Sequence, residues 1–73
     1  MPRLPNITAT EAVQAFVRAG FEITAQKGSH VRLQNLGGTK ITIPMHSGDL
    51  KRPLLKAVIK QAGLNETEFR KFL

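Results

Sequence analysis

The sequence predicts an α+β domain in which two helices cover one face of a three-stranded antiparallel sheet, followed by a short C-terminal helix. Apolar residues recur at helical spacing near both ends of the chain, whereas in the middle they alternate with polar residues. The 73 residues contain no repeat, linker or low-complexity segment, which predicts a single domain over residues 1–73. Because each long helix has one apolar stripe, both should pack on the same side of the sheet and form two layers.

The first helix is predicted over about residues 9–19 from its apolar spacing. Thr8 and Glu11 are spaced as in a capping box, in which each side chain accepts a hydrogen bond from the backbone N–H of the other residue. Gly20 suits the position that follows a helix, where the backbone often turns left-handed. The apolar residues at helical spacing are Ala9, Ala12, Val13, Phe16 and Val17.

Three short strands are predicted next, because apolar and polar residues alternate and glycines separate the segments. Gly28 and the pair Gly37-Gly38 mark the two hairpins. The alternating apolar residues are Phe21, Ile23 and Ala25, then Val31 and Leu33, then Ile41 and Ile43.

The register of both hairpins follows from keeping the apolar side chains on one face, since a slip of one residue turns every side chain over. In the first hairpin this rule predicts Ala25 opposite Leu33, with a three-residue loop over 28–30. In the second hairpin it predicts Leu33 opposite Ile41.

A second helix is predicted from a further apolar stripe that ends at Gly63, with Pro53 tolerated only in its first turn. Asn65 and Glu68 offer another capping box for the short C-terminal helix. The apolar residues are Leu54, Leu55, Val58, Ile59 and Ala62 in the second helix, and Phe69 and Phe72 in the third.

The charge balance favours a polyanionic partner. Eleven Lys and Arg residues against five Asp and Glu give a formal net charge of +6, with an isoelectric point near 10.6. Nucleic acid is the partner favoured by such an excess, although small domains also carry charge for solubility alone. No apolar run exceeds three residues and no cysteine is present. We therefore expect a cytoplasmic protein with no membrane association.

The two histidines, His30 and His46, are predicted to lie together at one end of the sheet. Extending the ladder of the second hairpin sets His30 opposite Pro44, and His46 follows two residues further along the same strand edge. The second helix begins shortly afterwards, and its N-terminal N–H groups suit a phosphate.

Basic residues cluster in sequence around this predicted corner. Arg52, Lys56 and Lys60 recur every four residues and form a basic stripe, in which like charges repel by a few tenths of a kcal/mol per pair. Contact with phosphates explains the stripe, and a merely solvated face is the alternative. The residues expected to contact RNA are Lys27, Ser29, Arg32, Lys40, Lys51, Arg52, Lys56 and Lys60.

These residue types suit RNA cleavage, because RNA carries its own nucleophile, the 2′-hydroxyl. A general base is needed to take its proton, and His30 fits that role, with His46 as a secondary candidate for an acid or a phosphate ligand. No metal or cofactor is required. The alternatives are a non-catalytic RNA-binding module, in which His30 is a surface residue without chemistry, and a small structural subunit.

Four segments form a pattern that is specific when taken together: Ala19 to Phe21, Lys27 to His30, Ile43 to His46, and Leu55 to Leu64. Through them the chain resembles the HicA family of toxin mRNA endoribonucleases over nearly its full length. The resemblance implies the fold of a double-stranded-RNA-binding domain and ribosome-independent cleavage of mRNA in the cytoplasm. It also implies that His30 is the catalytic residue and that a HicB-type antitoxin covers the site.

Overall fold

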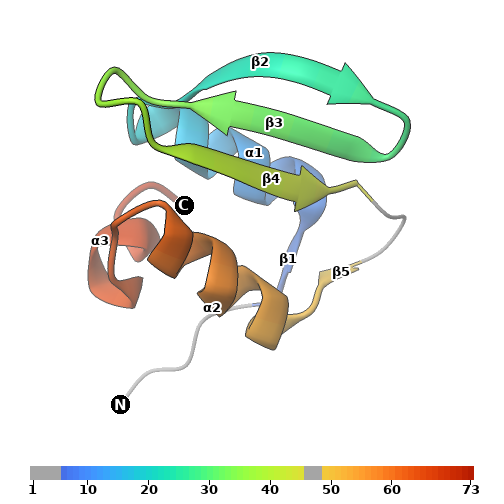
Figure 1. Cartoon of the computed structure of the whole chain (residues 1–73). Coiled ribbons are helices and arrows are strands. Elements are labelled where there is room, and N and C mark those ends of the chain that lie inside the picture. Colours follow the sequence, from blue (N-terminus) through green and yellow to red (C-terminus); the bar gives the residue numbers. More distant parts are fainter. Residues whose placement is uncertain (1–5, 46–48) are drawn as a thin grey trace.

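The computed structural model describes residues 6–45 and 49–73 and confirms the predicted order of one helix, three antiparallel strands and two further helices (Figure 1). The helices are α1 (Ala9–Arg18), α2 (Arg52–Gln61) and α3 (Glu66–Arg70). The strands of the main sheet are β2 (Glu22–Lys27), β3 (His30–Gln34) and β4 (Lys40–Pro44), and two short strands, β1 (Ile7–Thr8) and β5 (Asp49–Leu50), form a separate pair.

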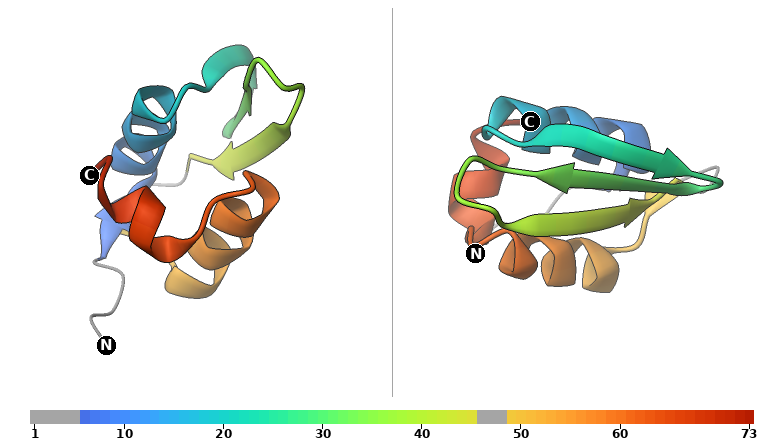
Figure 2. Two further views of the ribbon diagram at one scale, coloured as in Figure 1. Left: turned by 90° about the vertical axis from the view of Figure 1, so that its left-hand side faces the viewer. Right: turned by 45° about the horizontal axis from the view of Figure 1, so that its top comes forward.

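The two long helices cover one face of the main sheet, as the sequence predicts. In the main sheet, α1 packs against β2 and β4, and α2 packs against β4. The short helix α3 packs against α2. The right-hand view of Figure 2 looks onto the opposite face of the sheet, where β2, β3 and β4 lie in front of both helices. This uncovered side is called the outer face below. No helix within residues 6–45 and 49–73 is both long and apolar enough to span a bilayer.

The predicted capping box of the first helix is present, whereas the third helix has its Asn65 cap without the reciprocal bond to the Glu68 side chain. In α1 the Thr8 hydroxyl accepts a hydrogen bond from the Glu11 N–H at 3.1 Å, and the Glu11 carboxylate accepts one from the Thr8 N–H at 3.0 Å. The Asn65 side chain accepts from the Glu68 N–H at 2.8 Å and begins α3. These bonds satisfy N–H groups that have no partner within a helix.

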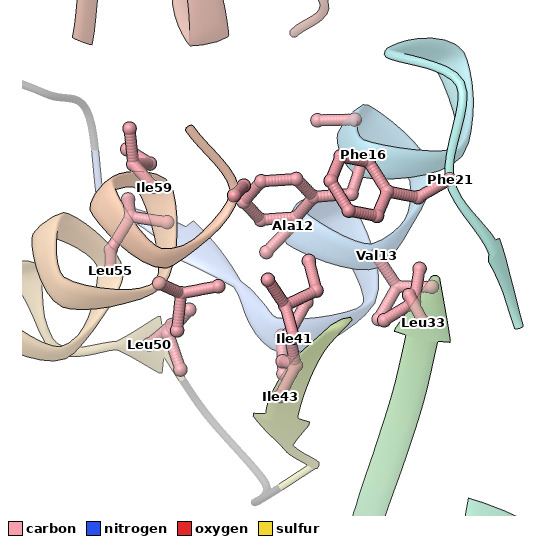
Figure 3. Close-up of a cluster of buried hydrophobic side chains, with 14 of the residues drawn as sticks. Ala12, Val13, Phe16, Phe21, Leu33, Ile41, Ile43, Leu50, Leu55 and Ile59 are labelled. Carbon is pink, nitrogen blue, oxygen red and sulfur yellow. The ribbon is translucent and has the colours of Figure 1, made fainter. Parts of the chain in front are cut away.

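The core lies between the sheet and the helices, with Phe16 of α1 at its centre (Figure 3). Phe16 is fully buried and meets Phe21 edge-on, with ring centroids 5.7 Å apart, and Phe69 at 4.9 Å. The sheet contributes Val31, Leu33, Ile41 and Ile43, and α2 contributes Leu55, Val58 and Ile59. Aromatic pairs of this kind stabilise by about 0.5–1.5 kcal/mol beyond the burial of their area.

The pair of β1 and β5 was not predicted, because two-residue strands carry no alternation to recognise. Ile7 lies opposite Leu50 in an antiparallel pair, and both side chains are buried in the core. The pair holds the segment that leads into α1 beside the segment that leads into α2. The two helices therefore start from one common anchor.

The predicted register is confirmed in the second hairpin and wrong in the first. Leu33 lies opposite Ile41, as predicted. In the first hairpin Leu33 lies opposite Ile23, not Ala25, and the register shifts between Ile23 and Ala25. Thr24 is the extra residue, and β2 therefore carries a bulge.

The turn explains this difference. The loop has two residues, Gly28 and Ser29, and Gly28 has a φ of +58°, as expected for the first loop position of a type II′ turn. A two-residue turn alone would put Ile23 on the outer face, and the bulge returns it to the helix side. Ile23 is nevertheless 53 % exposed, because β2 is the edge strand remote from β4, on which α2 packs. Ala25 lies on the outer face, so the predicted burial of both is wrong.

Replacing Thr8 with alanine removes the N-cap of α1 and should lower the free energy of unfolding by about 0.5–2 kcal/mol. Urea denaturation measures the change. Thr10→Ala is the matched control, because Thr10 is an exposed residue inside the same helix and its substitution should change stability by less than about 0.5 kcal/mol. Equal losses in the two variants would contradict the capping role.

Candidate nucleic-acid interface

His30 lies on the outer face as the first residue of the central strand β3. Val31 and Leu33 of the same strand are buried on the helix side of the sheet. Successive side chains of a strand point to opposite faces, so His30 points away from the helices and is exposed. The imidazole can therefore be reached by a large substrate.

Lys27 lies directly beside His30. The two residues are paired across β2 and β3 on either side of the turn. Opposite residues of an antiparallel pair share a face, with Cβ atoms about 4.5–5.5 Å apart. The predicted pairing of Ala25 with Leu33 would have put Lys27 opposite Val31, on the buried side. The observed turn and bulge instead place Lys27 directly opposite His30 on the outer face.

Arg32 is the second cation on this part of the outer face. It follows His30 by two residues in β3, so its side chain leaves the same face about 7 Å further along the strand. Its opposite neighbours, Ala25 and Thr42, have short side chains, which leave the guanidinium open to solvent. We call Lys27, His30 and Arg32 the outer-face cluster.

Lys40 shares the outer face but lies further from His30. It is paired with Gln34, which is four residues from His30, a distance of about 13 Å along β3. Lys40 therefore extends the positive charge toward the other end of the sheet rather than joining the outer-face cluster. Thr42 lies opposite Arg32 on the same face, as its alternation with Ile41 and Ile43 indicates, but it is not among the residues expected to contact RNA.

The turn beside His30 is tied to the end of β4. The Met45 backbone N–H donates a hydrogen bond to the Ser29 carbonyl, and Pro44 lies opposite His30, as predicted. This bond holds the first hairpin against the neighbouring strand. The predicted second histidine, His46, lies outside the described residues, so its place relative to His30 stays a prediction.

The start of α2 lies at the same end of the molecule as the β2–β3 turn, in the views of both Figure 1 and Figure 2. Lys51 occupies the N-cap position and is exposed, while Arg52 is the first helical residue and is half-buried. The helix therefore presents its positive end and two basic residues at the end of the sheet that carries His30.

The remaining basic residues of the predicted set lie in the helix layer. Lys56 of α2 is 3.7 Å from the Glu66 carboxylate of α3, which partly neutralises its charge. Lys60 follows one turn later in α2 and is exposed. The basic stripe and the outer-face cluster therefore belong to different layers of the fold.

No group of three or more His, Cys, Asp or Glu side chains gathers where the structure is described, so those residues offer no cluster for a metal ion.

Comparison with known proteins gives one family. The model of a family described as HicA toxin of bacterial toxin-antitoxin matches residues 9–64. None of the curated proteins matches the chain. The matched range begins with α1, ends just after α2, and includes His30 and the whole main sheet.

Replacing Gly28 with alanine tests the two-residue turn that connects Lys27 to His30. A side chain at a φ of +58° is strained, and the variant should lose about 1–2 kcal/mol of unfolding free energy. Gly37→Ala is the control, because that glycine does not have a positive φ and an added Cβ meets only Asn35 Oδ1 at 3.5 Å. Denaturant unfolding measures both, and equal stability of the two variants would contradict the turn assignment.

Proposed function

The chain belongs to the HicA family of toxins, and from this premise we propose that it is an endoribonuclease that cuts mRNA without a metal ion and without the ribosome. The observation that carries the proposal is the outer-face cluster. It places an accessible imidazole between two cations, on a face that no helix of Figure 2 covers. A toxin–antitoxin system is the setting that the family supplies.

The proposed reaction is transfer of the phosphate to the neighbouring 2′-oxygen of the RNA. His30 accepts the proton of the 2′-hydroxyl, and the 2′-oxygen attacks the adjacent phosphorus. The bond from phosphorus to the 5′-oxygen breaks, and this oxygen takes up a proton as it leaves. The products are a 2′,3′-cyclic phosphate and a 5′-hydroxyl. A positioned proton-transfer group of this kind contributes about 10²- to 10⁴-fold to the rate.

Lys27 and Arg32 are proposed to bind the reacting phosphate. The negative charge on its oxygens grows as the fifth bond to phosphorus forms, and fixed cations stabilise that charge. Arg32 can donate two parallel hydrogen bonds to a phosphate, whereas Lys27 acts as a point charge. His46 is the proposed secondary candidate for the group that protonates the leaving oxygen. Because the nucleophile belongs to the substrate, the scheme requires no metal ion and no cofactor.

The other basic residues are proposed to hold the RNA strand on either side of the cluster. Lys51 and Arg52 add positive charge at the start of α2, and Lys40 adds it along the sheet. Ser29 offers a hydroxyl group at the turn. Lys56 and Lys60 are proposed as weaker contacts because they lie further along α2 than Arg52, and Lys56 is already paired with Glu66.

A HicB-type antitoxin is the proposed protein partner, and the cytoplasm is the proposed location. The family supplies an antitoxin partner. The net charge of +6 and the exposed cations of the outer face favour a partner with an acidic surface that covers His30. Such a cover would exclude RNA directly.

A non-catalytic RNA-binding module is the second candidate. The same exposed cations would bind phosphates whether or not His30 transfers a proton, since charge neutralisation alone supplies most non-specific affinity for nucleic acid. Loss of cleavage with retention of binding separates the two functions.

Replacing His30 with alanine should reduce RNA cleavage by about 10²- to 10⁴-fold or more while RNA binding is largely retained. Cleavage is followed on a labelled RNA in the presence of EDTA, and the product ends are analysed for cyclic phosphate. Gln26→Ala is the matched control, because Gln26 is an exposed residue of the same hairpin, paired with Val31 and therefore facing the other side of the sheet. That variant should cut RNA at the normal rate.

Two results would contradict the catalytic role. One is cleavage by the His30→Ala variant at the rate of the parent protein, and the other is cleavage that depends on added Mg²⁺. If the parent protein binds RNA but does not cut it, the non-catalytic alternative is correct.

Arg32→Gln and Lys56→Gln each remove one positive charge, yet they should affect RNA binding differently. Arg32→Gln should reduce the slope of log affinity against log salt concentration by about 0.7, the value for one phosphate contact on a single strand. Lys56→Gln should change the slope by clearly less, because Lys56 lies in the helix layer beside Glu66. Fluorescence anisotropy between about 50 and 200 mM salt measures both slopes. A larger effect of Lys56→Gln would place the RNA on the helices.

A further inference from the structure

We propose that the outer face also carries a pocket that binds one guanine base of the RNA, with the Glu22 carboxylate as its main recognition group. This inference rests on the proposed function, since it assigns the substrate preference of the same surface. It concerns the end of the sheet opposite to His30, at the left of Figure 1, where β2 begins and β3 ends.

The pocket is formed by the start of β2 and by the end of β3 with the loop that follows. Its volume is about 250 Å³, just below the range of about 300–1,000 Å³ for pockets that enclose drug-sized ligands, which suits one base. Glu22 and Gln34 lie opposite each other in the sheet, so both side chains leave on the outer face. The lining residues are Gly20, Glu22, Thr24, Gln34, Asn35 and Leu36.

The polar groups of the pocket match the hydrogen-bonding edge of guanine. Guanine presents two adjacent donors, the N1–H and the N2 amino group, beside the acceptor O6. A carboxylate has two acceptor oxygens and can take both donors at once. The Asn35 Oδ1 already accepts the Thr39 N–H at 2.8 Å, which orients the side chain and makes its Nδ2 amide the donor for O6. Adenine presents only one donor, beside an acceptor that a carboxylate repels.

Glu22 has no structural task that explains an acid at this position. Glu11 caps α1, Glu66 pairs with Lys56, and Glu68 lies in the first turn of α3, where negative charge is favoured. Within residues 6–45 and 49–73, Glu22 is the acid on the outer face of the main sheet, and no ion pair or hydrogen bond is observed for its side chain there. On a surface that meets phosphates such an acid weakens binding unless it accepts a hydrogen bond from the RNA.

Leu36 supplies the apolar surface that a base needs. Its side chain is completely exposed at the tip of the β3–β4 loop and lines the pocket, so it contributes nothing to the core. A base seated on Glu22 would cover part of this side chain and remove apolar area from water. The exposed Leu36 side chain is thus a second observation that supports a base in this pocket, separate from the Glu22 carboxylate.

The spacing between pocket and cluster fixes where the guanine lies relative to the cut. Gln34 is about 13 Å from His30 along β3. A stacked strand advances about 3.4 Å per nucleotide and a stretched strand advances further, so the distance corresponds to about two to four nucleotides. The guanine should therefore occur at one fixed offset within this range.

The test measures RNA binding by the His30→Ala variant, which leaves the oligonucleotides intact. Labelled uridine oligonucleotides that contain one guanosine, one inosine, one adenosine or none are compared by fluorescence anisotropy. The guanosine oligonucleotide should bind about 5- to 150-fold more tightly than the adenosine one, the discrimination of one bidentate base contact. Inosine lacks the N2 amino group and should lie between the two.

Glu22→Gln, combined with His30→Ala, should abolish this preference and strengthen binding to the uridine-only oligonucleotide, because a negative charge is removed from the binding face. Glu68→Gln makes the same chemical change on α3 and should preserve the preference. Equal affinities for guanosine and adenosine, or a guanosine preference that survives Glu22→Gln, would overturn the inference.

Mapping the cuts made by the protein with His30 intact separates this inference from the proposed function. Cleavage with guanine enriched at one offset supports both, and cleavage with no such enrichment overturns the pocket alone. Binding that prefers guanosine in a protein that cuts no RNA overturns the nuclease proposal and supports the pocket.

Discussion

Burial of Val31 and Leu33 beneath the helices is the constraint on which the outer face depends. β3 is the central strand, with hydrogen-bonded neighbours on both sides, so it cannot slip without exposing these two side chains. Because side chains alternate along a strand, fixing the buried pair also fixes His30, Arg32 and Gln34 on the opposite side. The five residues of β3 thus contribute both to the core and to the surface proposed to bind RNA. The packing of Val31 and Leu33 in the core with Phe16 and the apolar residues of α2 therefore keeps the His30 side chain exposed on the opposite face.

The first hairpin satisfies two demands that conflict. The turn at Gly28 and Ser29 requires a two-residue loop, whereas the core requires Ile23 to face the same way as Leu33. A bulge at Thr24 reconciles them by adding one residue to β2 between the turn and the core. The chemical consequence lies on the turn side of the bulge, where Lys27 stands beside His30. Bulges also twist an exposed edge strand and discourage pairing with another chain, which suits the wholly exposed β2.

Charge is sorted between the two layers of the fold. The acids of the helix layer cap helices or pair with lysine, as Glu11 and Glu66 do. The outer face holds Lys27 and Arg32 around His30 at one end, and the acid Glu22 together with Lys40 at the other. A strand of RNA laid along β3 would thus meet first a centre suited to its phosphates and then a pocket suited to a base. One strand of five residues is long enough to link the proposed cleavage site with the proposed base pocket.

The sequence by itself determined the three helices, the three strands of the main sheet, the N-cap residues of α1 and α3, the register of the second hairpin and the exposure of His30. Each depends on local periodicity, on a side chain reaching a backbone group three residues away, or on a short glycine loop. Only the tertiary structure decided the partner of Lys27, the pairing of β1 with β5, and the separation of Lys56 from the outer face. A bulge leaves the alternation of a sequence unchanged, two-residue strands are too short for a pattern, and a helical stripe does not reveal which neighbour it faces. Those features depend on residues far apart in the chain, and packing alone brings them together.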